Sequence, residues 1–148
     1  MEDDRPTTWS IDVWEDSKTG KSPFDRSFAK LGQYEQAVVL EVIDKIVKRL
    51  GIDVCDTEWG KPLGDGLYEI RMRRSLQATS AWGQPDADSA QSGADGRSVL
   101  IRLFVTFHGE RVVLLFQAYD KGRDPSTKRQ EREVKAARKY LKAWRSGR

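Results

Sequence analysis

Arginines at alternate positions of one short segment are the residues of this chain best suited to chemistry on an anion. Residues 66–74 read GLYEIRMRR, which alternates as expected of a β-strand. One face of this strand would carry Leu67, Glu69, Arg71 and Arg73, and the other Tyr68, Ile70 and Met72. Two arginines and a glutamate on one face favour a surface that meets an anion. A charged edge strand protected against aggregation would show the same pattern, so both interpretations stay open.

A second arginine-bearing strand follows later in the chain. Residues 99–108 read VLIRLFVTFH and send their apolar residues mainly to one face, with Arg102 on the less apolar face. A Gly-Glu pair at 109–110 predicts a two-residue turn into a third strand, residues 111–119, after which Lys121 follows. We therefore expect the arginines of both strands and Lys121 to converge on one face of a sheet.

Where the anion is an RNA phosphodiester, such a face would suit cleavage without a metal ion. The reaction needs a base for the 2′-hydroxyl, positive charge on the pentacoordinate phosphorus and an acid for the leaving 5′-oxygen. Arg71 and Arg102 are the candidates for stabilising the phosphorane, because a guanidinium matches phosphate oxygens and keeps its charge. Lys121 is the candidate acid or base, since neighbouring arginines would lower its pKa, and Tyr119 is the reserve candidate. Arg73, on the same face, completes the expected catalytic set.

Other polar residues have alternative roles. Glu69 either neutralises Arg71 or acts as a base, and His108, beside the predicted turn, fits a turn or surface role better than a catalytic one. Cys55 is the only cysteine and His108 the only histidine, so the sequence excludes a Cys/His zinc site. We expect neither a metal nor a cofactor.

The elements that position these residues predict an α+β fold with a small antiparallel sheet of about four strands. Residues 9–14 alternate as a first strand, and Ser22-Pro23 begins a short helix. The apolar stripe of residues 34–50 predicts a longer helix. Residues 53–60 are expected to form a loop, and the turn-rich residues 61–66 to lead from it into the arginine strand.

One insertion and a last helix complete the predicted fold. Residues 76–98 are small and polar, so we expect an inserted loop in which Trp82 alone needs a contact. Asp124-Pro125 predicts the cap and first position of a C-terminal helix. The chain, residues 1–148, is expected to form one domain, with its helices on one face of the sheet and the arginines on the other.

Positive charge is concentrated near the C-terminus. Residues 121–148 contain eleven lysines and arginines against three acidic residues, whereas the first 20 residues contain six acidic residues against two basic ones. This asymmetry indicates an acidic partner such as nucleic acid. The basic residues that we expect to contact RNA are Lys61, Arg74, Arg123, Lys128 and Arg129. No apolar segment approaches the roughly 20 residues of a membrane span, so we expect a soluble, cytoplasmic protein with no membrane partner.

Several segments together resemble the RelE/ParE superfamily of bacterial toxins, in its phage-derived HigB-like branch. They are SPFDRSFAKL, the valine-rich helix after it, KPLGDGLYEIRMRR, VLIRLFVTFHGERVVLLFQAYDKGRDP and the closing basic helix. The resemblance covers residues 9–144 apart from the insertion. It implies a RelE-like fold and a toxin of a type II toxin-antitoxin system, which acts as a ribosome-dependent messenger RNA endonuclease and inhibits translation.

The resemblance also implies partners and site residues. The partners would be a cognate helix-turn-helix antitoxin of the HigA type, the ribosome and messenger RNA. Arg71, Arg102 and Lys121 fall on basic positions of the family's active site, although the family's doubled lysine is here Asp120-Lys121-Gly122. Two other functions stay open: inhibition of DNA gyrase, as in ParE-like members, and non-catalytic binding of RNA by a basic surface.

Overall fold

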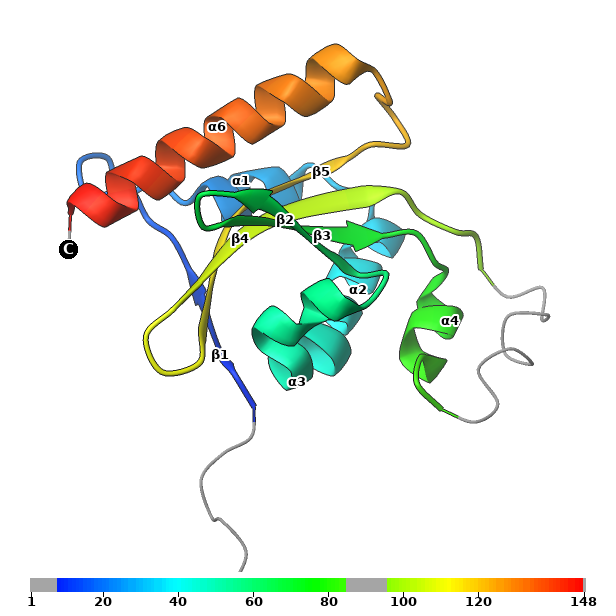
Figure 1. Ribbon diagram of the computed structural model, residues 1–148. Helices are drawn as coiled ribbons and strands as arrows, with labels where there is room; N and C mark the ends of the chain where they lie inside the picture. Colours follow the sequence, from blue (N-terminus) through cyan, green and yellow to red (C-terminus); the bar gives the residue numbers. More distant parts are fainter. Residues whose placement is uncertain (1–7, 85–95, 148) are drawn as a thin grey trace, which may run out of the picture.

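The computed structural model describes residues 8–84 and 96–147, and its centre is a five-stranded mixed sheet. The strand order is β1-β5-β4-β3-β2, and every neighbouring pair is antiparallel except β1 and β5 (Figure 1). The expected α+β class is confirmed, whereas the expectation of about four antiparallel strands is wrong. The differences are a parallel first strand and an additional strand before the arginine segment.

Three central strands form where the sequence predicts strands. They are β3 (Leu67–Met72), β4 (Ile101–His108) and β5 (Val112–Asp120). On β3, Ile70 packs into one apolar core and Leu67 into another on the opposite side of the sheet. The period of two therefore assigns these residues to the correct faces.

The outer strands differ from the expectation. β1 (Ser10–Val13) forms where a first strand is predicted, but it pairs in parallel with β5. β2 (Gly60–Gly64) forms where turn residues predict a loop, and it pairs with β3 at the edge of the sheet. Its Pro62 is tolerated because an edge strand needs no ladder hydrogen bond on its outer side.

The first helix begins as the sequence predicts. α1 (Pro23–Ala29) is capped by Ser22, whose hydroxyl accepts a hydrogen bond from the Asp25 backbone N–H at 3.1 Å. The Ser27 hydroxyl accepts a hydrogen bond from Ala118 N at 3.0 Å, in the part of β5 that β1 does not pair with. α1 therefore covers an otherwise open edge of the sheet.

The expected helix over residues 34–50 forms in continuous parts. They are α2 (Gln33–Val42), the π-helical η1 (Ile43–Val47) and α3 (Lys48–Leu50), followed by the 3-10 helix η2 (Gly51–Asp56). Gly51 ends the long helix with a φ of 53°, at a point where Trp9 lies too close for any side chain.

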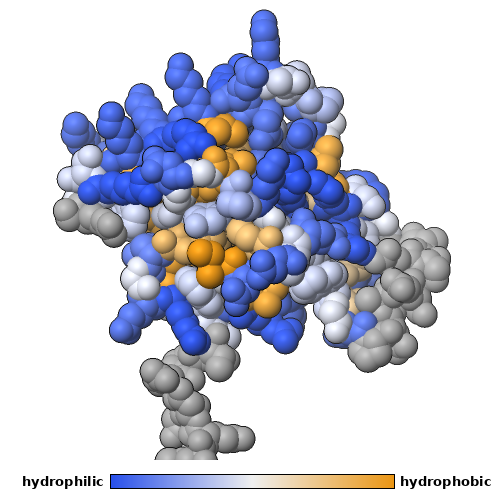
Figure 2. Space-filling model, viewed as in Figure 1, coloured by the Kyte–Doolittle hydropathy of each residue, from blue (hydrophilic) through white to orange (hydrophobic). Residues whose placement is uncertain are grey.

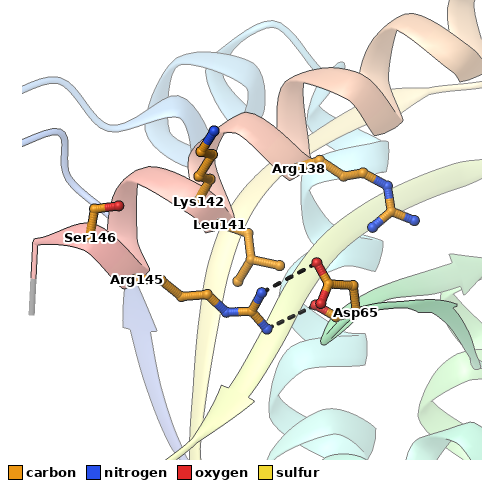
Figure 3. Close-up of a pocket in the computed structure, with 6 residues that line it drawn as sticks. All are labelled: Asp65, Arg138, Leu141, Lys142, Arg145 and Ser146. Carbon is orange, nitrogen blue, oxygen red and sulfur yellow. Dashed lines mark hydrogen bonds and ion pairs between the residues drawn. The ribbon is translucent and has the colours of Figure 1, made fainter.

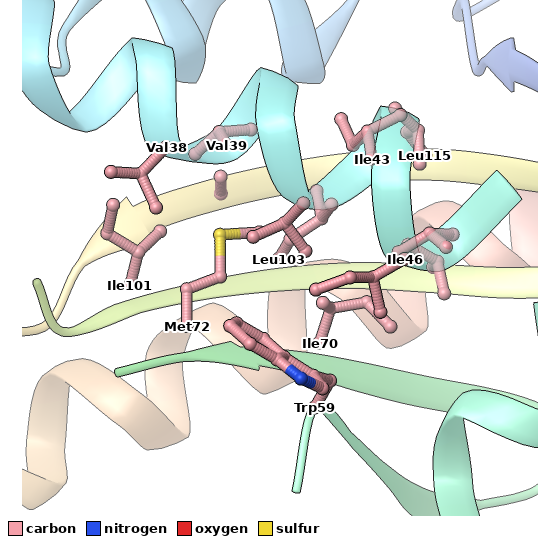
Figure 4. Packing of buried hydrophobic residues seen from close by; sticks show 14 of the residues in the cluster. Val38, Val39, Ile43, Ile46, Trp59, Ile70, Met72, Ile101, Leu103 and Leu115 are labelled. Atoms are coloured by element: carbon pink, nitrogen blue, oxygen red, sulfur yellow. The ribbon is translucent and has the colours of Figure 1, made fainter. Parts of the chain in front are cut away.

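The apolar stripe of this helix and one face of the sheet form the main core. Figure 4 shows Val38, Val39, Ile43 and Ile46 from the helix close to Ile70, Met72, Ile101, Leu103 and Leu115 from the strands. Trp59, which is fully buried, joins this cluster beside β2. The charged residues that are buried in the sheet, Glu69 and Arg102, lie on its other face.

The C-terminal helix also lies on that other face, so the expectation of helices on one face only is wrong. α6 (Thr127–Ser146) crosses β3, β4 and β5 on the side away from α2 (Figure 1). Its apolar residues Val134, Ala137 and Leu141 share a core with Leu67, Phe104 and Phe116 of the strands. The cause is the apolar stripe of α6, which needs a partner, while the α2 face is already covered.

Two local expectations also change. The N-cap of α6 is Ser126, whose hydroxyl accepts a hydrogen bond from Arg129 N at 3.2 Å, whereas Asp124 accepts one from the Ser126 hydroxyl. The turn between β4 and β5 consists of residues 109–111 rather than two residues.

The first part of the expected loop is a helix. α4 (Leu76–Ala81) follows β3. Trp82 makes the contact that the sequence indicates, since its ring packs against that of Trp59 in a T-shaped arrangement with 5.9 Å between centroids. Residues 85–95 of the insertion and the acidic residues 1–7 lie outside the described residues.

Candidate active site

Three polar side chains form a row across the sheet on its α6 side. Arg71 on β3 is directly opposite Arg102 on β4, and Arg102 is directly opposite Tyr119 on β5. Neighbouring strands lie about 5 Å apart, so the row spans about 10 Å. We call these three residues the arginine row. Alternation predicts the face on which the arginines lie, and the strand register aligns them.

A buried carboxylate lies beside this row. Glu69, only 1% exposed, accepts a hydrogen bond from Arg71 Nε at 2.9 Å and one from Gln130 Nε2 of α6 at 2.6 Å. The same carboxylate lies 3.6 Å from Arg102 Nε. Both of its oxygens are thus engaged, which favours the structural role of Glu69 over that of a base. Within the described chain no contact occupies the two terminal nitrogens of Arg71, which can bind an anion.

Arg102 is the more enclosed of the two arginines in the row, with 4% of the residue exposed. Its Nη1 donates a weak hydrogen bond to Ile101 O at 3.4 Å, and its Nε is buried without a hydrogen-bond partner in the described residues. Burial lowers the pKa of Arg102, yet an arginine keeps its charge at physiological pH. In this conformation Arg102 therefore acts on the site through its charge.

Tyr119 is held by α6. Its hydroxyl donates a short hydrogen bond to Gln130 Oε1, and the Arg129 guanidinium lies over its ring, 5.0 Å from the centroid. Burial raises the pKa of Tyr119 to about 12. The phenol stays protonated at neutral pH, so its geometry fits positioning better than proton abstraction.

Lys121 follows the end of β5 and belongs to the same cluster of charges. Burial, together with the positive charges of Arg102, Arg71 and Arg73, lowers the pKa of the Lys121 amine. Arg73, one residue beyond β3, is exposed and also lowers the pKa of Arg102. The structure thus brings together all five residues that the sequence indicates as catalytic candidates. Two of the five are partly exposed and have a group available for a substrate. Arg71 has two terminal nitrogens without a contact in the described residues, and Lys121 has an amine with a lowered pKa.

Two of the expected RNA-binding residues flank the cluster on the side of β2 and β3. Lys61 is opposite Glu69 in the β2–β3 register and is exposed. Arg74 is paired with Glu58 through two hydrogen bonds, from Nε at 2.8 Å and from Nη2 at 2.6 Å. Arg74 therefore belongs to a neighbouring pocket rather than to the arginine row.

The other three lie on the side of β5 and α6. Arg123 and Arg129 line a cavity of about 270 Å³ that also touches Tyr119 and Lys30. Arg129 is engaged with Glu133, at 3.0 Å, whereas Arg123 is largely exposed, with 69% of its side chain accessible. Lys128 is exposed in the first turn of α6.

Sequence reasoning misses Gln130, which links α6 to the site through Glu69 and Tyr119. A signal was available in the helical spacing. Gln130 lies four residues before Val134 and seven before Ala137, so it shares the face of α6 that packs on the sheet.

A second group of basic residues on α6 has a structural role. Figure 3 shows Arg138 and Arg145 close to Asp65 in a pocket of about 420 Å³. Arg145 donates a hydrogen bond to the Asp65 carbonyl at 2.8 Å, and Arg138 donates to the carbonyls of Leu63 at 2.7 Å and Gly64 at 3.2 Å. These contacts fasten the β2–β3 turn to α6, at the end of β3 away from Arg71.

No family model, curated protein or solved structure matches this chain at a significant level. In residues 8–84 and 96–147, no three His, Cys, Asp or Glu side chains are grouped to hold a metal ion. The helices within the same ranges are all too short or too polar to cross a membrane. Fold and site together define an α+β protein with a basic cluster on one sheet face.

Proposed function

We propose that this chain is a toxin of a type II toxin-antitoxin system that cleaves messenger RNA on the ribosome, using side chains alone. The observation that carries the proposal is the clustering of Arg71, Arg73, Arg102 and Lys121 around one sheet face. Glu69 is close to only two of these four cations, Arg71 and Arg102, so the cluster keeps an excess of positive charge. This excess favours binding of a phosphodiester.

In the proposed reaction, the neutral amine of Lys121 takes the proton of a ribose 2′-hydroxyl. The 2′-oxygen then bonds to the adjacent phosphorus, and the bond from phosphorus to the 5′-oxygen breaks. The 5′-oxygen takes a proton from water, leaving a 2′,3′-cyclic phosphate and a 5′-hydroxyl. The lowered pKa of Lys121 supports this role, because a larger fraction of the amine is neutral near pH 7.

Arg71 is the proposed contact to the phosphorane oxygens. Its Nε is held by Glu69, which fixes the guanidinium plane and leaves the terminal nitrogens for the phosphate. Arg102 adds positive charge from its buried position in the sheet. The hydrogen bond between Tyr119 and Gln130 holds α6 beside the arginine row. Such preorganised positive charge stabilises the transition state without reorganisation during the reaction.

The ribosome is proposed to supply alignment of the substrate. α6 exposes Lys128, Arg132, Lys135, Lys139 and Lys142. Figure 2 shows hydrophilic side chains along this upper side of the molecule. Such a face suits ribosomal RNA, and alignment of the 2′-oxygen with the phosphorus is itself worth several kcal/mol. We therefore expect free messenger to be cut poorly and ribosome-bound messenger to be cut well. Equal cleavage of both would contradict the ribosomal part of the proposal.

One observation favours a second candidate function, non-catalytic binding of RNA. Arg102 and Tyr119 are 4% and 2% exposed, so the deepest part of the row is closed to a substrate in this conformation. A phosphate-binding surface without cleavage needs only the exposed Arg73 and the half-buried Arg71 and Lys121. Catalysis is the stronger candidate because Glu69 fixes the guanidinium of Arg71 within the cluster of cations, and fixed positive charge is what stabilises a phosphorane.

The test is a translation reaction in vitro with the purified protein, in which messenger 5′ ends are mapped by primer extension. We expect new ends inside the reading frame that depend on translating ribosomes and disappear with Arg71→Ala. Arg49→Ala, which removes an exposed arginine of α3 on the opposite side of the sheet, is the matched control and should keep the ends. Intact messenger with unimpaired translation would contradict the proposal and direct attention to a gyrase supercoiling assay.

A further inference from the structure

We propose that a pocket beside the arginine row binds a nucleobase that carries an exocyclic amino group, next to the cleaved bond of the RNA. The inference rests on the proposed function, since it gives that site a substrate preference. The pocket has a volume of about 390 Å³, at the lower end of the range of about 300–1,000 Å³ in which proteins bind small ligands. Its lining includes Glu58, Arg73, Arg74, Ser75, Ala78 and Ser98.

Arg73 connects this pocket to the catalytic cluster. It lines the pocket, and its charge also lowers the pKa of both Arg102 and Lys121. Arg73 is exposed, and no carboxylate pairs with it in the described part of the chain. A phosphate bound by Arg73 would therefore lie between the arginine row and the pocket, which places the adjoining nucleotide in the pocket.

The polar floor of the pocket is an ion pair rather than a free cation. Glu58 receives two hydrogen bonds from Arg74, at 2.8 and 2.6 Å, while 35% of the Glu58 side chain stays exposed. The pair has no net charge, and the carboxylate would repel a second phosphate. A neutral base with hydrogen-bond donors on its edge is the part of a nucleotide that fits this site.

Glu58 determines which base edge is accepted. A carboxylate has about four acceptor positions, and Arg74 uses two of them. The remaining ones accept a hydrogen bond from an amino group such as N4 of cytosine, whereas uracil presents the acceptor O4 at that position. The pocket thus favours cytosine over uracil among pyrimidines of equal size.

The walls of the pocket are small and fixed. Ser75 Oγ accepts a hydrogen bond from Ala78 N at 3.1 Å, which leaves its O–H free to donate to a ligand. On the other side, the Tyr34 hydroxyl donates to Arg97 O at 2.8 Å and accepts from Leu76 N at 2.9 Å. Tyr34 therefore ties the two segments that carry Ser75 and Ser98 to α2, and the pocket exists before ligand binds.

The experiment measures binding of the full chain to fluorescein-labelled pentacytidine and pentauridine by fluorescence anisotropy at one fixed salt concentration. Both probes carry 2′-O-methyl groups, so they cannot be cleaved through the 2′-oxygen. The wild type should bind pentacytidine at least about fivefold more tightly, the ratio that corresponds to the lower limit for a good base contact. Glu58→Gln should reduce the ratio to less than about twofold, since an amide offers both a donor and an acceptor. Glu131→Gln, an exposed change on α6, should leave the ratio unchanged.

Equal affinities in the wild type, or a preference that survives Glu58→Gln, would overturn the inference. Because the assay measures binding only, it separates this inference from the proposed function. A protein that prefers pentacytidine but leaves messenger intact on ribosomes would keep the pocket and contradict the nuclease. A protein that cuts messenger but binds both probes equally would do the reverse.

Discussion

On the α2 side of the sheet, the buried strand residues are all apolar, whereas on the α6 side Glu69, Arg102 and Gln117 share the buried surface with leucines and phenylalanines. The α2 side is closed by a long helix with a wide apolar stripe. The α6 side is closed partly by apolar contacts of α6 and partly by the polar contacts of Gln130. The α2 side of the sheet therefore contributes stability, whereas the α6 side combines stability with buried charge.

Buried charge has a cost that the α6 face must offset with specific partners. A carboxylate as enclosed as Glu69 is tolerated because two arginines and one amide surround it. Arg102 is less well satisfied, since its Nε has no hydrogen-bond partner in the described residues. Arg102 therefore depends on the nearby carboxylate of Glu69 to compensate its charge.

The largest expected effect lies on the charged face. Lys121→Met should lower the rate of ribosome-dependent cleavage by about 10²-fold to 10⁴-fold, because it removes the proposed base. The free energy of unfolding should change little, since Lys121 lies outside the strands and is only half-buried. Single-turnover cleavage and urea unfolding measure the two quantities. Unchanged cleavage would remove Lys121 from the mechanism.

A matched change on the apolar face should have the opposite pattern. Leu103→Ala removes a side chain that is fully buried among the residues of the main core. We expect the free energy of unfolding to fall by about 3 kcal/mol, through lost burial and a residual cavity. Cleavage per folded molecule should stay near the wild-type rate. A large loss of activity in folded protein would show that the two faces are not separable in function.

Glu69→Gln tests the connection between stability and charge on the α6 face. The negative charge of Glu69 raises the pKa of Lys121, so its removal should lower that pKa further. Since a base must be neutral, the rising limb of the pH–rate profile should move to lower pH. The unfolding free energy should also fall by roughly 2 kcal/mol, because the buried Arg102 loses its compensating charge. A limb that moves to higher pH, or does not move, would contradict the assignment of Lys121 as base.

The smallest effect is expected at the far end of α6. Arg145→Ala removes the ion pair and hydrogen bond to Asp65 in the pocket of Figure 3. The Asp65 side chain is 84% exposed, so the loss of unfolding free energy should stay below about 1 kcal/mol. Thermal unfolding at two salt concentrations measures it. A loss of several kcal/mol would mean that this contact, and not the apolar stripe, holds α6 on the sheet.

Sequence periodicity predicts much of this arrangement. The period of two places Arg71 and Arg102 on the same face, and the apolar stripe over residues 34–50 predicts the helix that closes the opposite one. Ser22 and Pro23 correctly mark the beginning of α1. These features depend on local spacing, which a sequence displays directly.

What the sequence does not predict depends on partners far apart in the chain. Period alone does not say which element covers the arginine face, so the position of α6 and the contact between Gln130 and Glu69 are missed. β2 is missed because Pro62 and two glycines are typical of turns, although they are tolerated at a sheet edge. The Glu58–Arg74 pair joins residues 16 apart in sequence, so no local sequence pattern predicts it.

A messenger with a single 2′-deoxynucleotide at the mapped cleavage position tests whether the ribose 2′-oxygen is the nucleophile. The messenger is held on programmed ribosomes and treated with the wild-type protein beside an all-ribose control. If the charged face promotes attack by the 2′-oxygen, the control is cut and the substituted messenger stays intact at that bond. Cleavage of the deoxy-substituted bond at the rate of the control would contradict the account.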